Sequence, residues 1–351
     1  MKYNYERLPL ARQLRKLTQK EVAQLAGISQ ANLSKAEVGF LELSDESIMK
    51  LSEVYDFPLS FFMQNSELSP DGHLYFRRRL SLSAKEINSF VARVRVYKQI
   101  VDTIMEMVEI PEFHLQTYST TMNSPQDIAD KVRYELKLYR GPVPNLTTIL
   151  ENNGIIVIRF DFGTDKIDGL TSITARGRKI IFVNSEMPND RVRFSMAHEL
   201  GHLIMHIETS PSDVTAVEDE AQAFASEFLM PEQDIKTSLY KVDFSSLGIL
   251  KQRWRVSMKS LLVRAHSLGT IKDATYKNMM INYSKRKYNQ GEPLPLMLEE
   301  PLLFEHTIKL LANNGFSERD LMDLMHINER DYREWFVPKS KIIDIRIKSK
   351  K

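Results

Sequence analysis

Hydrophobic positions recur along most of this chain with the period of an α-helix. The longest such pattern predicts one helix over residues 83–108, with apolar side chains at Ile87, Phe90, Val91, Val94, Tyr97, Ile100, Val101, Ile104, Met105 and Val108. A second predicted helix, over residues 217–229, is closed by Pro231, which cannot continue a helix. Helices are also expected from residue 250 to residue 288. The chain is therefore predominantly helical.

One region instead has the apolar runs of β-strands. Residues 155–160, 169–175 and 179–183 fit strands, and 176–178 fit a hairpin turn between the last two. A small antiparallel sheet beside helices is the simplest arrangement of these segments. We therefore predict an α+β fold with an all-α helix bundle at the N-terminus and a helical C-terminal region.

The N-terminal bundle has the helix start and stop signals of a helix-turn-helix. Thr18 and Glu21 form a capping box for a helix that ends near Gly27, and Ser29 begins the next helix after a tight turn. The predicted core side chains are Leu14, Val22, Leu25, Ile28, Leu33, Ile48 and Leu51. The outer face of the second helix carries side chains that suit base edges and phosphates, namely Gln30, Asn32, Ser34 and Lys35.

The chemistry of the chain is concentrated in an H-E-x-x-H pentapeptide. His198 and His202 are four residues apart, so on a helix both imidazoles lie on one face and can bind a single metal ion. Glu199 lies beside them, where it can take a proton from water that zinc has acidified to a pKa of about 7. The pentapeptide alone is also compatible with an ordinary, partly buried helix.

A catalytic zinc ion needs a third protein ligand. Glu218, on the predicted helix 217–229, is the best candidate, because the apolar face marked by Phe224 and Leu229 turns it towards the H-E-x-x-H helix. Glu220 is the rival. His206 is a weaker candidate, because its distance from His198 along one straight helix is about 12 Å. We expect it to be a helix-end histidine with a structural partner.

The segment R-F-x-x-A-H-E-x-G-H, followed by E-x-x-A-x-x-F-A-x-x-F-L-M-P, resembles the ImmA/IrrE metallopeptidases, a gluzincin-type group. The resemblance implies that His198, His202 and Glu218 bind Zn²⁺ and that Glu199 is the general base. It also implies an edge strand that holds an extended peptide by backbone pairing. Gln222 departs from the family, in which Asn or Asp often stands at this position and orients a ligand imidazole.

Residues 7–63 resemble the XRE/Cro-type DNA-binding domain, on the run T-Q-x-E-V-A-x-L-A-G-I-S-Q-x-x-L-S-K-x-E. The resemblance implies that DNA is contacted by Gln19, Ser29, Gln30, Asn32, Ser34 and Lys35. We expect binding to depend on salt and on homodimerisation of the chain. A domain of the same fold can also bind a protein, such as a partner repressor, and this alternative stays open.

Composition limits the remaining possibilities. The 351 residues carry a formal net charge of +2, so attraction to nucleic acid must come from local basic groups. Since the chain has no cysteine, disulfides and thiolate metal sites are excluded. The sequence shows no N-terminal apolar signal and no long apolar span. We therefore expect a cytoplasmic protein that does not interact with membranes.

The end of the chain repeats the N-terminal pattern. Residues 317–332 can be aligned with residues 18–33, so that Leu321, Leu324, Ile327 and Tyr332 take the places of Val22, Leu25, Ile28 and Leu33. The outer helix of this second helix-turn-helix-like bundle carries Glu329, Asp331 and Glu334, which would repel phosphate. We therefore predict a structural or protein-contact role for it, and no reading of DNA.

Together these features predict four regions: a DNA-binding domain at 1–63, a linker and connecting helix at 64–115, a metallopeptidase domain at 116–235 and a helical region at 236–351. The leading hypothesis is a zinc-dependent endopeptidase that cleaves a transcriptional repressor in a stress, prophage or mobile-element response. The alternative is a DNA-binding regulator or antitoxin-like module whose peptidase fold senses metal or a protein without cutting.

Overall fold

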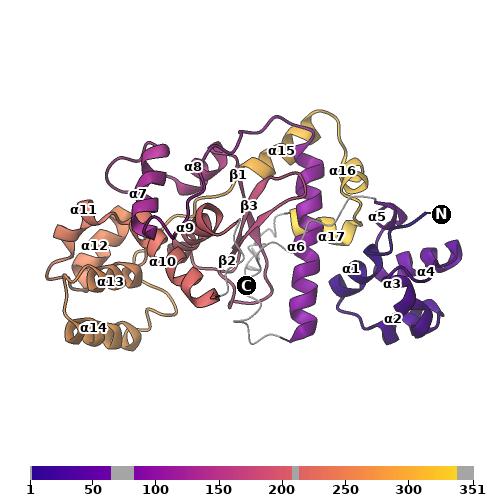
Figure 1. Ribbon diagram of the computed structural model, residues 1–351, viewed down its shortest axis with the longest axis horizontal. Coiled ribbons are helices and arrows are strands. Elements are labelled where there is room, and N and C mark those ends of the chain that lie inside the picture. The colour runs from indigo at the N-terminus through magenta and orange to yellow at the C-terminus, as the bar shows by residue number, and fades with distance from the viewer. Residues whose placement is uncertain (1, 65–82, 208–212, 338–351) are drawn as a thin grey trace, which may run out of the picture. The chain divides into compact units, whose positions relative to one another are not determined.

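The computed structural model describes residues 2–64, 83–207 and 213–337 (Figure 1). Most of the predicted linker, including residues 65–72, lies outside the described residues. The chain divides into two compact units. The first combines Met1–Ser66 with Leu311–Lys351, and the second is Glu67–Leu310. The predicted α+β fold is confirmed, with an N-terminal helix bundle, a small sheet and a helical C-terminal region.

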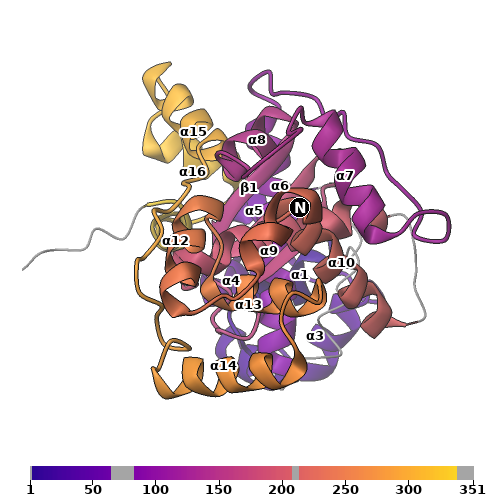
Figure 2. The same ribbon diagram turned by 90° about the vertical axis from the view of Figure 1, so that its left-hand side faces the viewer.

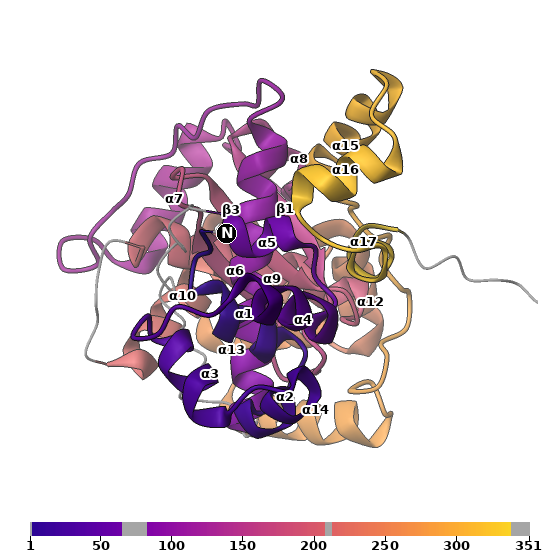
Figure 3. The ribbon, with the colours of Figure 1, turned by 90° about the vertical axis from the view of Figure 1, so that its right-hand side faces the viewer.

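The first unit is helical. Its N-terminal part contains α1 (Arg7–Leu14), α2 (Gln19–Ala26), α3 (Gln30–Glu37), α4 (Asp45–Tyr55) and α5 (Leu59–Met63), and its C-terminal part contains α16 (Glu318–Met325) and α17 (Glu329–Phe336). These helices are labelled in Figure 3, in indigo and yellow. Helix α15 (Leu303–Asn313) crosses the point in the sequence where the second unit ends and the C-terminal part of the first unit begins.

The predicted helix-turn-helix is present. The Thr18–Glu21 capping box starts α2, and Gly27 ends it in the left-handed conformation, at φ +65°. One predicted core residue is wrong, because the side chain of Leu25 is 65% exposed. The buried stripe of α2 is formed by Val22 and Ala23 with Ala26, and Leu25 projects about a quarter of a turn away from it.

The second unit is built on a three-stranded sheet with the order β1-β3-β2. Its strands are β1 (Ile155–Phe160), β2 (Gly169–Ile173) and β3 (Lys179–Asn184). The sheet is mixed, so the prediction of an antiparallel sheet is correct only for the β2–β3 hairpin. Strand β3 lies in the centre of the sheet, between β2, with which it pairs in antiparallel fashion, and β1, with which it pairs in parallel.

The two faces of the sheet are covered by different helices. The predicted long helix, α6 (Ala84–Met105), lies beside the sheet (Figure 1). The ring of its Tyr97 makes edge contacts with Phe160 and Phe182. The alternate side chains, such as Val157 and Ile181, join the main hydrophobic core on the opposite face. This face contacts α8 (Leu146–Asn152) and α9 (Asn189–Met205). The sheet therefore supports α9, which carries the H-E-x-x-H motif.

Further helices of this unit pack around α9. In the sequence, α7 (Pro125–Glu135) follows α6 and precedes α8. It packs on α10 (Val214–Leu229), and α10 packs on α9. The chain then forms α11 (Glu232–Ile235), the 3₁₀ turn η2 (Lys236–Leu239), α12 (Phe244–Trp254), α13 (Met258–Ser267) and α14 (Asp273–Lys285) (Figure 2). Among the predicted downstream residues, Trp254, Val256, Leu261, Leu262 and Ala265 are all in the core.

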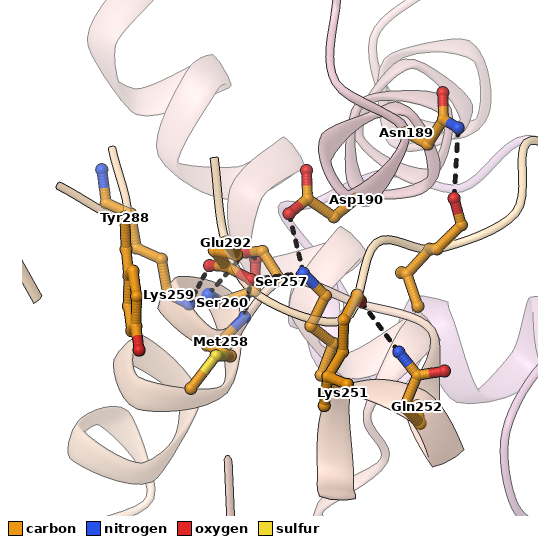
Figure 4. Close-up of polar contacts among 12 residues, drawn as sticks. Asn189, Asp190, Lys251, Gln252, Ser257, Met258, Lys259, Ser260, Tyr288 and Glu292 are labelled. Atoms are coloured by element: carbon orange, nitrogen blue, oxygen red, sulfur yellow. Dashed lines mark hydrogen bonds and ion pairs between the residues drawn. The ribbon is translucent and has the colours of Figure 1, made fainter. Parts of the chain in front are cut away.

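A buried ion-pair cluster fixes the beginning of α9 (Figure 4). The ammonium group of Lys251 is completely buried and lies 3.0 Å from a carboxylate oxygen of Asp190 and 2.9 Å from one of Glu292. Glu292 also accepts a hydrogen bond from the backbone N–H of Met258, at 2.7 Å. Buried charges are tolerated when they are paired and hydrogen-bonded in this way. The cluster therefore anchors the first turn of α9 to α12 and α13.

Candidate metal centre and nucleic-acid interface

Two glycines determine how closely the functional elements approach one another. A Cβ atom at Gly201 of α9 would lie 3.0 Å from the ring of Phe224 and 3.4 Å from the Cα of Ala221, both on α10. At Gly169 of β2, a Cβ atom would lie only 2.9 Å from Cγ of Glu199. Both positions leave little or no room for a larger side chain. Glycine thus permits α10 and β2 to pack closely against the H-E-x-x-H helix.

The structure brings His198, His202 and Glu218 together, as the sequence predicted. The two Nε2 atoms are 3.1 Å apart, and Glu218 places one carboxylate oxygen 3.5 Å from Nε2 of His198 and the other 3.6 Å from Nε2 of His202. Two ligands of a tetrahedral zinc ion, each about 2.0–2.1 Å from the metal, are about 3.3 Å apart. The spacing of these three groups therefore fits zinc.

The two other candidate ligands have a different arrangement. His206 lies at the end of α9, with its Nδ1 3.1 Å from Nδ1 of His202 and its Nε2 2.9 Å from the carboxylate of Glu220. If Nε2 of His202 is to bind a metal, its proton must be on Nδ1. That N–H then donates to Nδ1 of His206, and the N–H of His206 donates to Glu220. Glu220 and His206 thus form a chain behind His202.

The position of Gln222 differs from what the family resemblance implied. Its side chain is exposed on α10, whereas Nδ1 of His202 is hydrogen-bonded to His206. The sequence predicted that His206 is a helix-end histidine with a structural partner, but it did not identify Glu220, which it treated only as a rival ligand, as that partner. His206 lies one turn after the predicted ligand His202, but Glu220 is on another helix, so the spacing along the chain does not indicate the pair.

Glu199 is buried beside these groups and contacts β2. The hydroxyl of Thr171 lies 2.8 Å from Oε2 of Glu199 and 2.7 Å from its backbone carbonyl oxygen. Burial raises the pKa of the Glu199 carboxyl to about 7. This value is suited to a group that accepts and then returns a proton near neutral pH. Thr171 was not predicted from the sequence, because only the fold brings β2 to α9.

The histidines differ in their electrostatic surroundings. Burial, together with His198 and His206, lowers the pKa of His202 well below its usual value, so its imidazole is neutral at pH 7. Burial also acts to lower the pKa of His198, but Glu218, Glu199 and Asp168 outweigh it and raise that pKa. The carboxylates around His198 thus favour a positive charge at this point. A metal cation can supply that charge in place of a proton.

The first unit presents an exposed row of polar side chains on α3. Gln30, Asn32, Ser34 and Lys35 are all exposed, as predicted. Ser29 is exposed too, and its hydroxyl accepts a hydrogen bond from the backbone N–H of Asn32, at 3.1 Å. This bond caps the N-terminus of α3. The helix therefore offers amide, hydroxyl and ammonium groups of the kinds that bind bases and phosphates.

Gln19, at the start of α2, is less accessible than the row on α3. Its side-chain N–H donates to the carboxylate of Glu37 at 2.7 Å, and Arg12 forms a bidentate ion pair with the same carboxylate. Glu37 is buried, so this pair is a structural link between α1 and α3 that also holds Gln19 in place. Of the six predicted DNA contacts, Gln19 is the one that is fixed by another side chain.

Comparison with known families agrees with both parts of this description. Residues 150–266 match the IrrE N-terminal-like domain, a peptidase family, and residues 10–62 match a helix-turn-helix family. No curated protein matches the chain significantly. Within the described part of the chain, none of the helices is sufficiently long and apolar to cross a membrane. The predicted combination of an ImmA/IrrE-like peptidase domain with an XRE-type helix-turn-helix domain is thus confirmed.

Proposed function

We propose that this DNA-binding regulator, which joins a helix-turn-helix domain to a peptidase-like domain, is a zinc-dependent endopeptidase. The observation that carries the proposal is the convergence of three ligand groups, from His198, His202 and Glu218, at the spacing of a tetrahedral zinc site. Glu199 stands next to this site with a carboxyl pKa of about 7. Three ligands leave the fourth position of a tetrahedral ion open for catalysis.

In this proposal the reaction is hydrolysis of a peptide bond with Glu199 as general base and then general acid. Zinc, when bound, would supply Lewis-acid chemistry by polarising the peptide carbonyl and acidifying water. Glu199 takes a proton from the attacking water and delivers it to the departing amine. Thr171 orients the Glu199 carboxyl through the 2.8 Å hydrogen bond. His206 and Glu220 hold His202 in the tautomer that leaves Nε2 available.

The substrate in this proposal is an extended segment of a protein. β2 lies at the edge of the sheet order and contacts α9, so a peptide paired with its outer edge would pass beside the metal centre. Backbone pairing of this kind gives modest side-chain specificity, and exposure of the cleaved segment becomes decisive. The fused DNA-binding domain favours a transcriptional repressor as the substrate, cleaved in a stress, prophage or mobile-element response.

The experiment that tests the enzyme proposal compares wild type with Glu199→Gln. We expect both proteins to bind about one zinc ion per chain by elemental analysis, and only wild type to cleave a candidate repressor encoded next to it. A wild-type protein that binds zinc through His198 and His202, represses through its DNA-binding domain and cuts no partner would contradict the proposal. That result would favour the alternative, a regulator whose peptidase fold senses metal or protein.

A further inference from the structure

The C-terminal helices α16 and α17 reproduce the backbone of the N-terminal helix-turn-helix. All four helices of the two motifs are eight residues long, and each boundary of the second motif is displaced along the chain by the same number of residues. A capping box of Ser317 and Asp320 begins α16, just as Thr18 and Glu21 begin α2. The predicted second motif is therefore present in the structure.

The turns of the two motifs also correspond. His326 ends α16 at φ +55°, in the left-handed conformation that Gly27 adopts at the end of α2. The next residue in each motif closes the turn with a backbone hydrogen bond, from Ile28 to Ala23 at 3.0 Å and from Ile327 to Met322 at 3.1 Å. Since the backbones agree so closely, any difference in what the two motifs bind must come from their side chains.

The side chains of the second helix differ most at one position. Asn32 of α3 is exposed, whereas its counterpart on α17, Asp331, is only 1% exposed. A buried carboxylate is unfavourable unless it is paired. Asp331 is paired with Arg15, at the end of α1, through two hydrogen bonds of 2.7 and 2.6 Å. The position that is exposed in the first motif is thus buried against the first motif in the second. The prediction that Asp331 lies on an outer face and repels phosphate is therefore wrong, because its carboxylate is paired with Arg15.

Arg15 is held in place by the N-terminal domain. Its guanidinium donates to the backbone carbonyl oxygens of Tyr55, at 2.5 Å, and Asp56, at 2.7 Å, and it lies over the ring of Phe57, 4.3 Å from the ring centre. These contacts fix the plane of the guanidinium and leave one edge for a carboxylate. Asp331 fills this edge in the bidentate geometry that arginine favours.

A second polar contact comes from the beginning of α17. Ser29 uses its side chain to cap α3, but the equivalent Asn328 makes no cap. Its side-chain N–H instead donates to the carboxylate of Asp56, at 2.9 Å. Both departures from the first motif, at the cap position and at Asp331, are therefore directed at the same corner between α4 and α5.

We propose that the pair α16–α17 is a docking module whose partner is the N-terminal DNA-binding domain of the same chain. Arg15 is the receptor group, and Asp331 and Asn328 are the groups that bind it and its neighbour Asp56. The DNA-binding domain is then attached to the rest of the chain twice, covalently through residues 65–82 and non-covalently through the module. A cut within residues 65–82 would leave the domain attached. This inference does not depend on the proposed peptidase activity.

The test uses the full chain with a recognition site for a specific protease inserted between residues 64 and 83. After cleavage, we expect the N-terminal fragment to stay with the remainder in gel filtration at micromolar concentration. Asp331→Arg should weaken this association by at least about 30-fold, because it places two cations together in a buried site. Glu329→Gln is the matched control, since it removes an exposed carboxylate on the same helix that pairs within α17.

An isosteric variant protects the test against misfolding. Asp331→Asn keeps the shape of the side chain and one acceptor oxygen but removes the charge that pairs with Arg15, so we expect its association to lie between those of wild type and Asp331→Arg. Release of the fragment from the cleaved wild-type chain would overturn the proposal. Equal retention by wild type, Asp331→Asn and Asp331→Arg would overturn it too.

Discussion

The metal centre on α9 and the polar row on α3 use their side chains under opposite conditions. Glu199 and His202 are 7% and 9% exposed, and their pKa values are displaced from those of the free side chains by burial. Asn32 and Lys35 are exposed and remain surrounded by water. Burial strengthens electrostatic interactions and makes each group depend on its neighbours. Substitutions at the buried site should therefore have larger effects than those at the exposed row.

The largest effect should come from removing a metal ligand. Glu218→Ala is expected to weaken zinc binding by roughly a thousandfold, because each ligand contributes several kcal/mol to the total binding free energy. Glu220→Ala should weaken it by only about 10- to 100-fold, since it acts through His206 and His202. Competition with a chromogenic chelator measures both constants. A larger loss for Glu220→Ala would show that the ligand assignment is wrong.

Burial of Glu199 predicts a pH-dependent stability difference. The carboxyl pKa rises from 4.5 to about 7 on folding, so the folded metal-free protein keeps a proton that the unfolded chain loses, and stability falls as the pH rises through this window. Glu199→Gln removes this loss. The variant should gain about 3 kcal/mol in the free energy of unfolding, relative to wild type, between pH 4 and pH 8.

Urea titrations of the metal-free proteins at several pH values measure this difference. Glu186→Gln, which removes an exposed carboxylate of the same unit, reports the effect of the same substitution at the surface. A stability difference between Glu199→Gln and wild type that does not change with pH would contradict a raised pKa for Glu199.

A smaller effect is expected behind the ligand His202. His206→Phe keeps an aromatic ring but removes the acceptor for the Nδ1 proton of His202, so zinc binding should weaken by about 10- to 100-fold. His266, on α13, is the control, because it also pairs with a carboxylate, that of Asp273 at 2.7 Å. His266→Phe should leave zinc affinity unchanged. Equal zinc affinities for His206→Phe and wild type would show that His206 does not position the imidazole of His202.

The smallest changes in stability should occur on α3. Lys35→Ala and Asn32→Ala are expected to weaken DNA binding by about tenfold each, while the free energy of unfolding changes by less than about 0.5 kcal/mol. Only Lys35→Ala should reduce the salt dependence of binding, because it removes a phosphate contact. Lys50→Ala, on α4, is the control for the loss of an exposed ammonium group. Unchanged DNA affinity in both Lys35→Ala and Asn32→Ala would show that these side chains of α3 do not contact DNA.

Much of the fold follows from local patterns. The period of the apolar residues predicted α6 and α10, the Thr18–Glu21 capping box marked the start of α2, and the alignment with residues 18–33 predicted α16. Errors arose where neighbours in space decide the outcome. The apolar side chain of Leu25 is exposed because the small residues Ala23 and Ala26 fill the buried side of α2. The pairing order of the sheet likewise depended on contacts between β1 and β3, which the strand patterns do not specify.

In the candidate metal centre, too, some residues were predicted from local sequence and others were brought together only by packing. The spacing of His198, Glu199 and His202 places three functional groups on α9 whatever surrounds the helix, because helical geometry is set by the backbone. The apolar face of the predicted helix 217–229 added Glu218, and the family resemblance implied the same ligand. Thr171 and the pairing of His206 with Glu220 could not be read in this way, since each joins elements whose relative position depends on packing.

By itself, the sequence determined which residues share a helix face, where helices begin and end, and that the chain contains two helix-turn-helix patterns. Only the tertiary structure decided that Asp331 would be buried against Arg15, and that Glu199 would be buried between α9 and β2. The physical reason is that hydrogen bonds and helix caps act over a few residues, whereas burial depends on which distant surfaces meet. Burial sets the pKa of Glu199 and the need of Asp331 for a partner.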